Sequence, residues 1–400
     1  MNPNLNLLHP YPFEKLHQLY APIQANSKLS AVSFSLGEPK HPTPEIIKSA
    51  LVNGLDGLSH YPSTKGSQDL REAIASWIMR RYHLKTIDCN TQIIPVSGTR
   101  EALFAIAQTI IDNRQNNAYV ICPNPFYQIY EGAAYLAGAK IHYVNCDQNN
   151  FFQCDYESVV PEIWQKTQLL YVCSPGNPTG KVLSLKAWQN LFELSDKYNF
   201  VIIADECYSE IYFDENNPPL GALSAANQLN RGFERLLVFS SLSKRSSVPG
   251  LRSGFVAGDA HLISRFLLYR TYHGSALSLT TQAASIAAWN DETHVKENRL
   301  HYTKKFQDVI PILSTVLDVN WPDAAFYLWT NVANTGLNDV AFAQRLYEEK
   351  NVSVLPGSYL AREAHGNNPG KNYIRMALVA NYNECLDGAR RLQAFCKEIN

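Results

Sequence analysis

Lys244 follows the apolar run Leu236–Phe239, in the segment SSLSKRSSVPGLRS. A lysine attacks carbonyl groups and forms a Schiff base when burial or a neighbouring cation lowers the pKa of its amine. Arg245 and Arg252 could supply that neighbouring charge, and Arg252 could also bind a phosphate group with its planar fork of donors. Taken alone, Lys244 could equally be an ordinary surface lysine, because most lysines are exposed.

An acid and a tyrosine follow a second apolar run, in the segment ADECYSEIYF. Asp205 comes directly after Phe200–Ala204, so we expect it at the mouth of a buried strand, with Tyr208 three residues further on. A carboxylate there could pair with a cationic group of a ligand. The alternative is an aspartate that merely caps a turn or a helix.

Two turns of small residues follow other apolar runs. Ser97-Gly98-Thr99 lies between the run Ile93–Val96 and a helical segment that starts near Arg100, so free N–H groups at the helix start could bind a phosphate. The segment SPGNPTG follows Leu169–Cys173 and presents the side-chain amide of Asn177. Either turn, considered by itself, could be a loop without chemistry.

The elements that must position these residues alternate along the chain. Expected strands are Gln92–Val96, Tyr119–Cys122, Lys140–Val144, Leu169–Cys173, Phe200–Ala204, Leu236–Phe239 and Gly254–Ala257. Expected helices include Ser67–Arg81, Arg100–Ile111, Gln128–Leu136, Leu185–Tyr198 and Leu262–Tyr269. Runs such as LLYVC and FVIIA are apolar throughout, which predicts a mostly parallel sheet covered on both faces by helices. Ligands of such sheets bind beyond the carboxyl ends of the strands.

The two ends of the chain have a different pattern. The first 44 residues hold seven prolines and predict an irregular arm with a short helix at Phe13–Tyr20. After about residue 285 we expect a smaller α+β domain. It would contain one long helix (Ala283–Ile310), strands at Val316–Trp321, Phe326–Trp329, Val352–Leu355 and Tyr373–Leu378, and a last helix near Asn383–Ile399. The expected division is therefore an N-terminal arm that also forms part of the small domain (1–45), a large domain (46–285) and a C-terminal small domain (286–400).

Composition narrows the functional classes. Lys plus Arg number 35 and Asp plus Glu 36, a balance that argues against nucleic-acid binding. No apolar run is long enough to cross a membrane and no targeting segment is visible, so we expect a cytoplasmic protein. The eight cysteines form no CxxC pair. They predict reduced thiols, neither a disulfide framework nor a metal site.

One edge of one sheet would thus bring together six features: a lysine, an aspartate, an asparagine, a tyrosine, an arginine and a turn that can bind phosphate. Pyridoxal 5′-phosphate, which has an aldehyde, a basic ring nitrogen, a phenolic oxygen and a phosphate, would use all of them. The ordered segments SPGNPTG, DECYSEIYF, SLSKRSSVPGLRSG and YIRMALV resemble those of class I and II pyridoxal-phosphate aminotransferases of fold type I. The resemblance extends from Ser35 to the last helix.

The resemblance implies a role for each matching residue. Lys244 would form the Schiff base and move the substrate proton, Asp205 would keep the ring nitrogen protonated, and Tyr208 and Asn177 would bind the ring oxygen. Arg375 would grip the substrate α-carboxylate, beneath a mobile segment that contains Gly37. The remaining cofactor contacts would be the phosphate cup of Gly98, Thr99, Ser241 and Arg252, the stacking residue Tyr127, and Tyr61, which would reach the neighbouring subunit of a homodimer.

Within that family, segments such as NPFYQIYEGAAYLAGA and FLLYRTYHG look most like those of N-succinyldiaminopimelate aminotransferases. This resemblance implies amino transfer between N-succinyl-LL-2,6-diaminopimelate and 2-oxoglutarate. Candidate cations for the distal carboxylate are Lys40, Lys65, Arg245 and Arg270. Three alternatives are an aspartate, aromatic or kynurenine aminotransferase, a C–S β-lyase, and a ligand-sensing regulator. The regulator would need a DNA-binding module, for which the N-terminal arm is too short.

Overall fold

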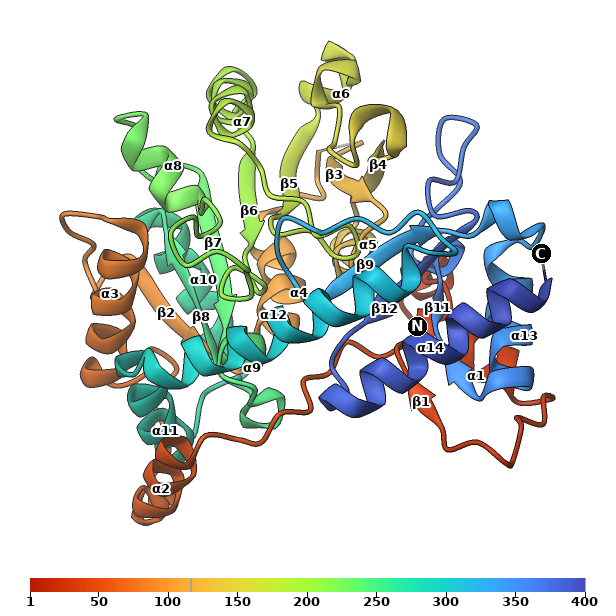
Figure 1. Cartoon of the computed structure of the whole chain (residues 1–400). Coiled ribbons are helices and arrows are strands. Elements are labelled where there is room, and N and C mark those ends of the chain that lie inside the picture. Colours follow the sequence, from red (N-terminus) through yellow and green to blue (C-terminus); the bar gives the residue numbers. More distant parts are fainter. Residues whose placement is uncertain (116, 400) are drawn as a thin grey trace.

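The structure is a computed structural model that describes residues 1–115 and 117–399. A seven-stranded sheet with the strand order β2-β8-β7-β6-β5-β3-β4 runs through its larger part (Figure 1). All neighbouring strands are parallel except for β8, which is antiparallel to both β2 and β7. The strands are β2 (Ile93–Val96), β3 (Tyr119–Asn124), β4 (Lys140–Asn145), β5 (Thr167–Cys173), β6 (Val201–Asp205), β7 (Leu236–Ser241) and β8 (Gly254–Gly258). All seven strands predicted from the sequence are confirmed within two residues.

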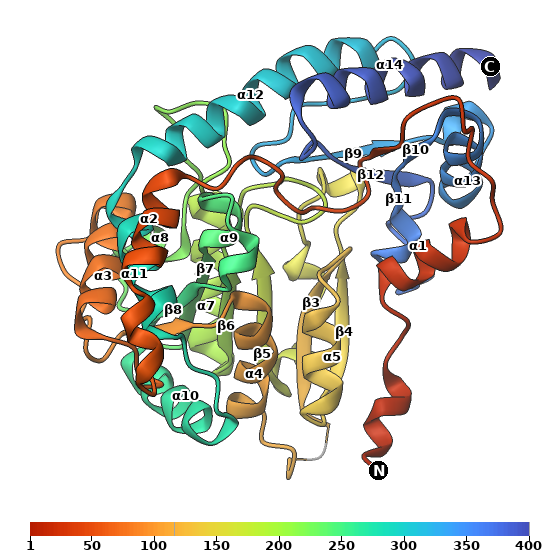
Figure 2. The same cartoon turned by 90° about the horizontal axis from the view of Figure 1, so that it is seen from below.

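Helices cover both faces of this sheet (Figure 2). Side chains alternate between two separate cores, so that Leu170 and Val172 of β5 belong to one and Leu169 and Tyr171 to the other. The first core contains α3 (Gln68–Tyr82), α7 (Leu185–Tyr198), α8 (Ala222–Gln228) and α11 (Leu279–Asn290), and the second contains α4 (Thr99–Ile110), α5 (Ile129–Leu136) and α10 (Ala260–His273). Burial on both faces explains why these strands are apolar throughout.

A smaller α+β unit is built from both ends of the chain. It contains the sheet β11-β12-β9 and the parallel pair β1-β10. Its strands are β1 (Val32–Ser33), β9 (Tyr327–Asn331), β10 (Val352–Ser353), β11 (Leu355–Pro356) and β12 (Tyr373–Ala377), and its helices include α1 (Pro12–Tyr20), α13 (Asp339–Lys350) and α14 (Tyr382–Ile399). The pairing of β1 with β10 fastens the N-terminal arm to this unit.

The helix α12 (Thr293–Leu313) bridges the two units (Figure 1). The prediction of one helix over Ala283–Ile310 is wrong, because α11 ends at Asn290 and α12 begins at Thr293. Asp291 follows the end of α11 in an extended conformation and accepts a hydrogen bond from the backbone N–H of His294 (3.0 Å), a break that apolar periodicity did not reveal. The strand predicted at Val316–Trp321 is also wrong, since this stretch is a turn and a loop. The division into 1–45, 46–285 and 286–400 stays a prediction.

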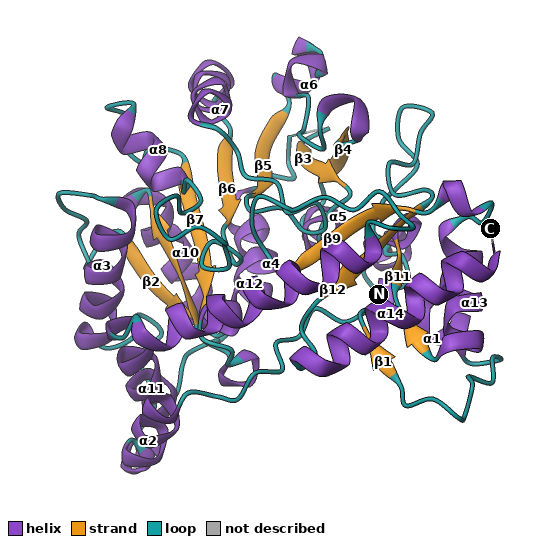
Figure 3. Cartoon of the chain, in the orientation of Figure 1, coloured by secondary structure: helices purple, strands orange, loops and turns teal. Residues whose placement is uncertain are grey.

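Short elements complete the larger unit: α2 (Glu45–Asn53), α6 (Pro161–Trp164) and α9 (Leu242–Arg245). Loops at the carboxyl ends of β5, β6 and β7 lie between this unit and β9 and β12 (Figure 3). None of the helices in the described part of the chain has the length and hydropathy that crossing a bilayer requires.

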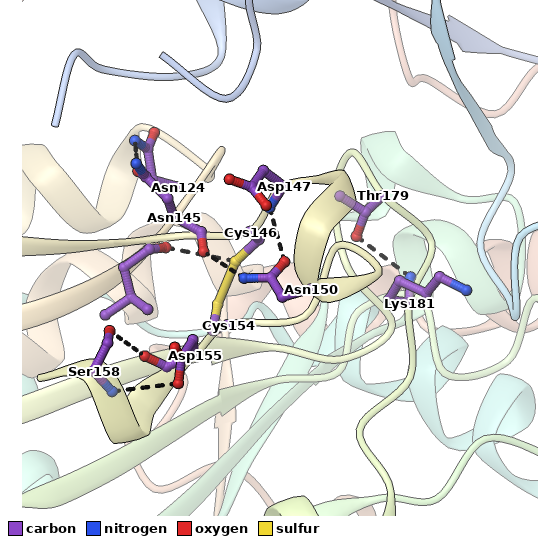
Figure 4. Close-up of a disulfide and its surroundings, with 11 residues drawn as sticks. Asn124, Asn145, Cys146, Asp147, Asn150, Cys154, Asp155, Ser158, Thr179 and Lys181 are labelled. Carbon is purple, nitrogen blue, oxygen red and sulfur yellow. Dashed lines mark hydrogen bonds between the residues drawn. A yellow bond between two sulfur atoms is a disulfide. The ribbon is translucent and has the colours of Figure 1, made fainter. Parts of the chain in front are cut away.

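One disulfide corrects the prediction that all cysteines are reduced. Cys146 and Cys154 are bonded, with their Cα atoms 4.7 Å apart (Figure 4). Asp147 accepts a hydrogen bond from the N–H of Asn149, and Asn150 from the N–H of Asp147, so the chain turns back between the two cysteines. Spacing in the sequence could not show this turn. The other six cysteines are free.

Candidate active site

Lys244 lies on α9, the single helical turn that follows β7, and its ammonium group is enclosed. Its Nζ donates a hydrogen bond of 2.6 Å to the carbonyl of Gly37 and lies 5.4 Å from the centre of the Phe326 ring. Burial lowers the pKa of Lys244 to about 8, and the positive charges of Arg375 and Arg252 act in the same direction. The neutral, nucleophilic form of this amine is therefore far more populated near neutral pH than that of an ordinary lysine.

Asp205 ends β6 and is buried at the floor of the same region. Its Oδ2 accepts a hydrogen bond of 2.6 Å from the hydroxyl of Tyr130, and its Oδ1 accepts one of 3.2 Å from the N–H of Cys207. Burial raises the pKa of this carboxyl, while the two hydrogen bonds oppose the rise. A buried carboxylate gains strongly from a cationic partner, so the position suits a protonated ring nitrogen.

Four residues from different elements gather at the start of α4. Gly98 has a φ of +87° and carries no side chain to cap the helix, which leaves first-turn N–H groups of α4 available to an anion. A Cβ at Gly98 would overlap the guanidinium of Arg252. Arg252 itself has a φ of 54°, an uncommon value for a non-glycine residue. Thr99 follows Gly98 in the chain, and the Ser241 hydroxyl donates to the carbonyl of Ser253 (3.1 Å), the residue after Arg252; both side chains are buried.

Arg375 lies on β12 and is almost completely buried. Its Nη1 donates to Oδ1 of Asn177 (3.0 Å), its Nη2 donates to the carbonyl of Ser35 (2.8 Å), and its Nε has no partner among the described residues. The guanidinium lies 4.4 Å from the centre of the Tyr327 ring. The Tyr327 hydroxyl is hydrogen-bonded to that of Tyr208 (2.8 Å), so Arg375, Asn177 and Tyr208 form one connected group.

Gly37 closes this group from the side of the N-terminal arm. A Cβ at this position would overlap the hydroxyl of Tyr327, so only glycine allows the arm to approach so closely. Four residues later His41 is held firmly: its ring is hydrogen-bonded to Asn298 (2.8 Å) and to Nζ of Lys305 (2.7 Å). Burial, followed by the charge of Lys305, lowers the pKa of His41 to about 4, so the ring is neutral. Any movement of the arm must therefore occur before His41.

Tyr127 and Tyr61, the two remaining residues predicted to contact the cofactor, differ in their surroundings. Tyr127 precedes α5 and its hydroxyl accepts a hydrogen bond of 2.8 Å from Nε of Arg100, beside the start of α4. Tyr61 is fully exposed, and no hydrogen bond connects it to the group around Lys244 within the described residues. The chain thus brings together every predicted site residue except Tyr61.

The residues present fit pyridoxal 5′-phosphate. The Gly98 turn and Arg252 offer donors and positive charge to a phosphate, Lys244 offers an amine of lowered pKa, and Asp205 offers a buried carboxylate. In addition, Nε of Arg375 is buried, has no partner in the described part of the chain and can donate to a carboxylate. These features would hold a phosphorylated aldehyde at one end and an amino acid at the other.

Two sequence expectations about arginines need correction. Arg245 is 1% exposed and bonds Glu292 (2.6 Å) and the carbonyl of Ala288 (2.7 Å), so it supports α11 and α12 instead of lowering the pKa of Lys244. Arg270 is fully buried and pairs with Glu101. Neither arginine is free to bind a distal carboxylate, and Arg375 takes the electrostatic role expected of Arg245.

Three residues of the site were missed. Tyr130 follows Tyr127 by three positions, and this helical spacing is a signal that could have been used. Tyr327 is the first residue of β9, and Phe326 directly precedes it. The strand β9 pairs with β12, so that Ala377 is opposite Tyr327. No sequence pattern predicted that pairing.

The comparisons with known proteins agree with this geometry. The family model described as aminotransferase class I and II matches residues 29–385. An LL-diaminopimelate aminotransferase from Dehalococcoides mccartyi is 29% identical over 392 residues, which cover 97% of each protein. An aspartate aminotransferase from Pyrococcus abyssi is 28% identical over 404 residues, covering 100% of this chain and 98% of the relative. The crystal structure of an aminotransferase from Neisseria meningitidis has a TM-score of 0.95 and 51% identity, covering 99% of this chain and 100% of that one.

Proposed function

The chain belongs to the class I and II aminotransferases, which use pyridoxal 5′-phosphate, and from this premise we propose that its substrates are N-succinyl-LL-2,6-diaminopimelate and 2-oxoglutarate. The products would be N-succinyl-2-amino-6-oxopimelate and glutamate. We propose further that it works in the cytoplasm as a homodimer with shared active sites, and that the residues assigned from the resemblance have the roles given above.

The observation that carries the proposed site is the environment of Lys244. The cofactor, when bound, supplies an aldehyde that captures amines and a ring that withdraws electrons from the substrate Cα. The neutral amine of Lys244 can receive the Cα proton and return it, because its pKa is near the working pH. Asp205 stabilises a protonated ring nitrogen, and Arg375 orients the substrate through its α-carboxylate.

The substrate proposal rests on the resemblance within the family and on the name of the relatives. Diaminopimelate itself is the substrate in the name of the Dehalococcoides protein, and it shares its carbon skeleton with the succinylated compound. A second candidate is aspartate, which the name of the Pyrococcus relative favours.

A steady-state panel tests the substrate proposal. The purified enzyme would be supplied with 2-oxoglutarate and with N-succinyl-LL-diaminopimelate, LL-diaminopimelate, aspartate, phenylalanine or kynurenine in turn. We expect the succinylated compound to have the highest kcat/KM. A preference of tenfold or more for any other amino acid, about 1.4 kcal/mol, contradicts the proposal. Release of pyruvate from cystathionine would indicate a β-lyase instead.

A further inference from the structure

Asn298 is a buried amide on the bridging helix α12 (Figure 1), to which neither the sequence nor the proposed chemistry assigned a role. Its Nδ2 donates hydrogen bonds to the carbonyl of Lys244 (3.1 Å) and to that of Arg245 (3.3 Å). Both carbonyls lie at the end of α9, and the last carbonyls of a helix have no partners within it. Asn298 therefore supplies hydrogen bonds that fix the backbone of the turn that carries Lys244.

These two bonds set the direction of a longer chain of hydrogen bonds. A carbonyl only accepts, so Nδ2 of Asn298 faces α9 and its Oδ1 faces His41 (2.8 Å), which must donate through its Nδ1–H. The His41 ring is neutral, so its Nε2 carries no proton and accepts from Nζ of Lys305 (2.7 Å). The bonds therefore run in one direction, from Lys305 through His41 and Asn298 to the carbonyl of Lys244.

Asn298 thereby holds both partners of the contact between Lys244 and the arm. Nζ of Lys244 donates to the carbonyl of Gly37 (2.6 Å), and His41 lies four residues further along the same arm. Asn298 binds the backbone of Lys244 on one side and the ring of His41 on the other. The Ser247 hydroxyl adds a bond to the carbonyl of His41 (3.0 Å). The turn that carries Lys244 and the base of the arm are thus fixed to the same amide.

Lys305 extends the chain of bonds to the smaller unit. It is 2% exposed, and its Nζ also donates to the carbonyls of Leu378 (3.2 Å) and Val379 (3.4 Å), which follow β12. A buried ammonium is costly unless its donors find acceptors, and Lys305 finds three. Since β12 carries Arg375, α12 connects the turn of Lys244, the arm and the strand of the arginine expected to bind the substrate carboxylate.

We propose that Asn298 is a positioning residue for amino transfer: it aligns the amine of Lys244 with the reacting atoms and, through His41, holds the arm over them. The inference rests on the proposed function, in which Lys244 receives and returns the substrate proton. The two bonds of Asn298 have separable consequences. The bond to the Lys244 carbonyl acts on proton transfer, and hence on kcat, whereas the bond to His41 acts on closure of the arm, and hence on KM.

The test compares Asn298→Leu, His41→Phe and the double variant with the wild type on N-succinyl-LL-diaminopimelate and glutamate. Leucine has nearly the shape of asparagine without its hydrogen bonds, and phenylalanine keeps a ring beside Tyr302. Asn298→Leu should lower kcat at least tenfold and raise KM at least threefold. His41→Phe should raise KM at least threefold and leave kcat within twofold. The double variant should match Asn298→Leu within twofold, because the bond between the two residues is already absent there. His301→Phe, an exposed histidine of α12 beside His41, is the control.

A second readout does not depend on the substrate. The cofactor-free chain captures pyridoxal phosphate through the amine of Lys244, and stopped-flow absorbance measures the rate. Asn298→Leu should slow this capture at least fivefold, while His41→Phe and His301→Phe should stay within twofold of the wild type. All rates are expressed per competent chain, counted as pyridoxyl groups fixed by borohydride. Asn298→Ser, which replaces the amide by a single hydroxyl, should change kcat, KM and capture in the same directions and serves where Asn298→Leu does not fold.

Two results would overturn the inference. If Asn298→Leu lowers the melting temperature but leaves kcat and the capture rate per competent chain unchanged, Asn298 only stabilises the fold. If the losses in Asn298→Leu and His41→Phe multiply in the double variant, the two residues act independently of each other. Should the wild type turn over neither N-succinyl-LL-diaminopimelate nor glutamate, the proposed substrates fail, and the capture rates alone decide the role of Asn298.

Discussion

At the scale of single residues, the chemistry depends on where a few charged groups are buried. Lys244 is enclosed near Arg375 and Arg252, and Asp205 is buried and accepts hydrogen bonds from Tyr130 and from the backbone N–H of Cys207. The first arrangement favours a neutral amine, and the second disfavours a carboxylate unless a cation binds beside it. Both groups therefore suit pyridoxal phosphate: the amine of Lys244 can react with its aldehyde, and the carboxylate of Asp205 can pair with its ring nitrogen.

The pKa of Lys244 leads to a pH prediction. Only the neutral amine attacks an aldehyde, so the rate at which the cofactor-free enzyme captures pyridoxal phosphate should rise as the pH increases through about 8 and then level off. Arg375→Met removes a positive charge that lowers this pKa, and it should move the midpoint to higher pH. Stopped-flow absorbance measures the rate. A wild-type midpoint near 10.5, the ordinary lysine value, would show that burial does not act on Lys244.

Asp205 and Tyr130 should differ in their effect on turnover. Asp205→Asn removes the charge that stabilises a protonated ring, and we expect kcat to fall on the order of 10³-fold. Tyr130→Phe removes only one hydrogen bond to that carboxylate and should cost about tenfold, since a hydrogen bond to a charged group contributes about 1.5 kcal/mol. Steady-state kinetics of both variants check this order. A loss below tenfold in Asp205→Asn would mean that another group protonates the ring.

The same residues show what a sequence can reveal. The sequence singled out four residues that the structure brings together. They are Lys244, Asp205 and Asn177, which come after apolar runs, and Arg375, which lies in a segment that resembles a motif of the family. Arg245 lies next to Lys244 in the chain but points into the core between α11 and α12, while Arg375, more than a hundred residues away, lies close to it. Tertiary contacts of this kind leave no local pattern.

At the scale of elements, loops and helix ends carry the site and the sheet fixes their position. The strands were predictable because burial on both faces requires continuous apolar runs, and β-turn residues mark their ends. Hydrophobic periodicity does not report the extended residue Asp291, at which the chain breaks between α11 and α12. Nor does it report the turn that brings Cys146 and Cys154 together. The arm was predicted as an irregular segment that forms part of the small domain, but the strand with which it pairs, β10, could not be foreseen.

The arm gives a prediction at this scale. In Gly37→Val the new side chain would overlap the Tyr327 hydroxyl, which forces the arm away and breaks the hydrogen bond between Lys244 and the Gly37 carbonyl. We expect the KM values for the two amino-acid substrates, N-succinyl-LL-diaminopimelate and glutamate, to rise at least tenfold. Gly232→Ala is the matched control, because a Cβ there meets no atom within 4 Å. Unchanged kinetics in Gly37→Val would show that the arm does not close over the substrate.

At the scale of the whole molecule, the fold type I architecture expected from the resemblance is confirmed by the family model and by the Neisseria structure. Completion of the site by a second chain stays a prediction. Its basis is the resemblance of Tyr61 to a residue that reaches the neighbouring subunit, together with the full exposure of its ring.

Complementation tests the shared site. Lys244→Ala and Tyr61→Ala should each be inactive or nearly so alone. Mixed under conditions that exchange subunits, they should regain about a quarter of the wild-type activity, because half of the dimers would be mixed and each would hold one intact site. Light scattering establishes the oligomeric state in the same samples. No recovery from dimers that do exchange, or a fully active monomer, would contradict the prediction.

The most direct test of the central claim, that Lys244 holds the cofactor, is borohydride reduction of the holoenzyme followed by peptide mapping. Reduction fixes the cofactor permanently to the nitrogen that carries it, and mass spectrometry then identifies the residue. We predict one pyridoxyl group per chain, on Lys244, and none in Lys244→Ala. Lys305 is the informative rival, because burial lowers the pKa of its amine to about 8 as well. A pyridoxyl group on Lys305, or on any lysine other than Lys244, would contradict the account.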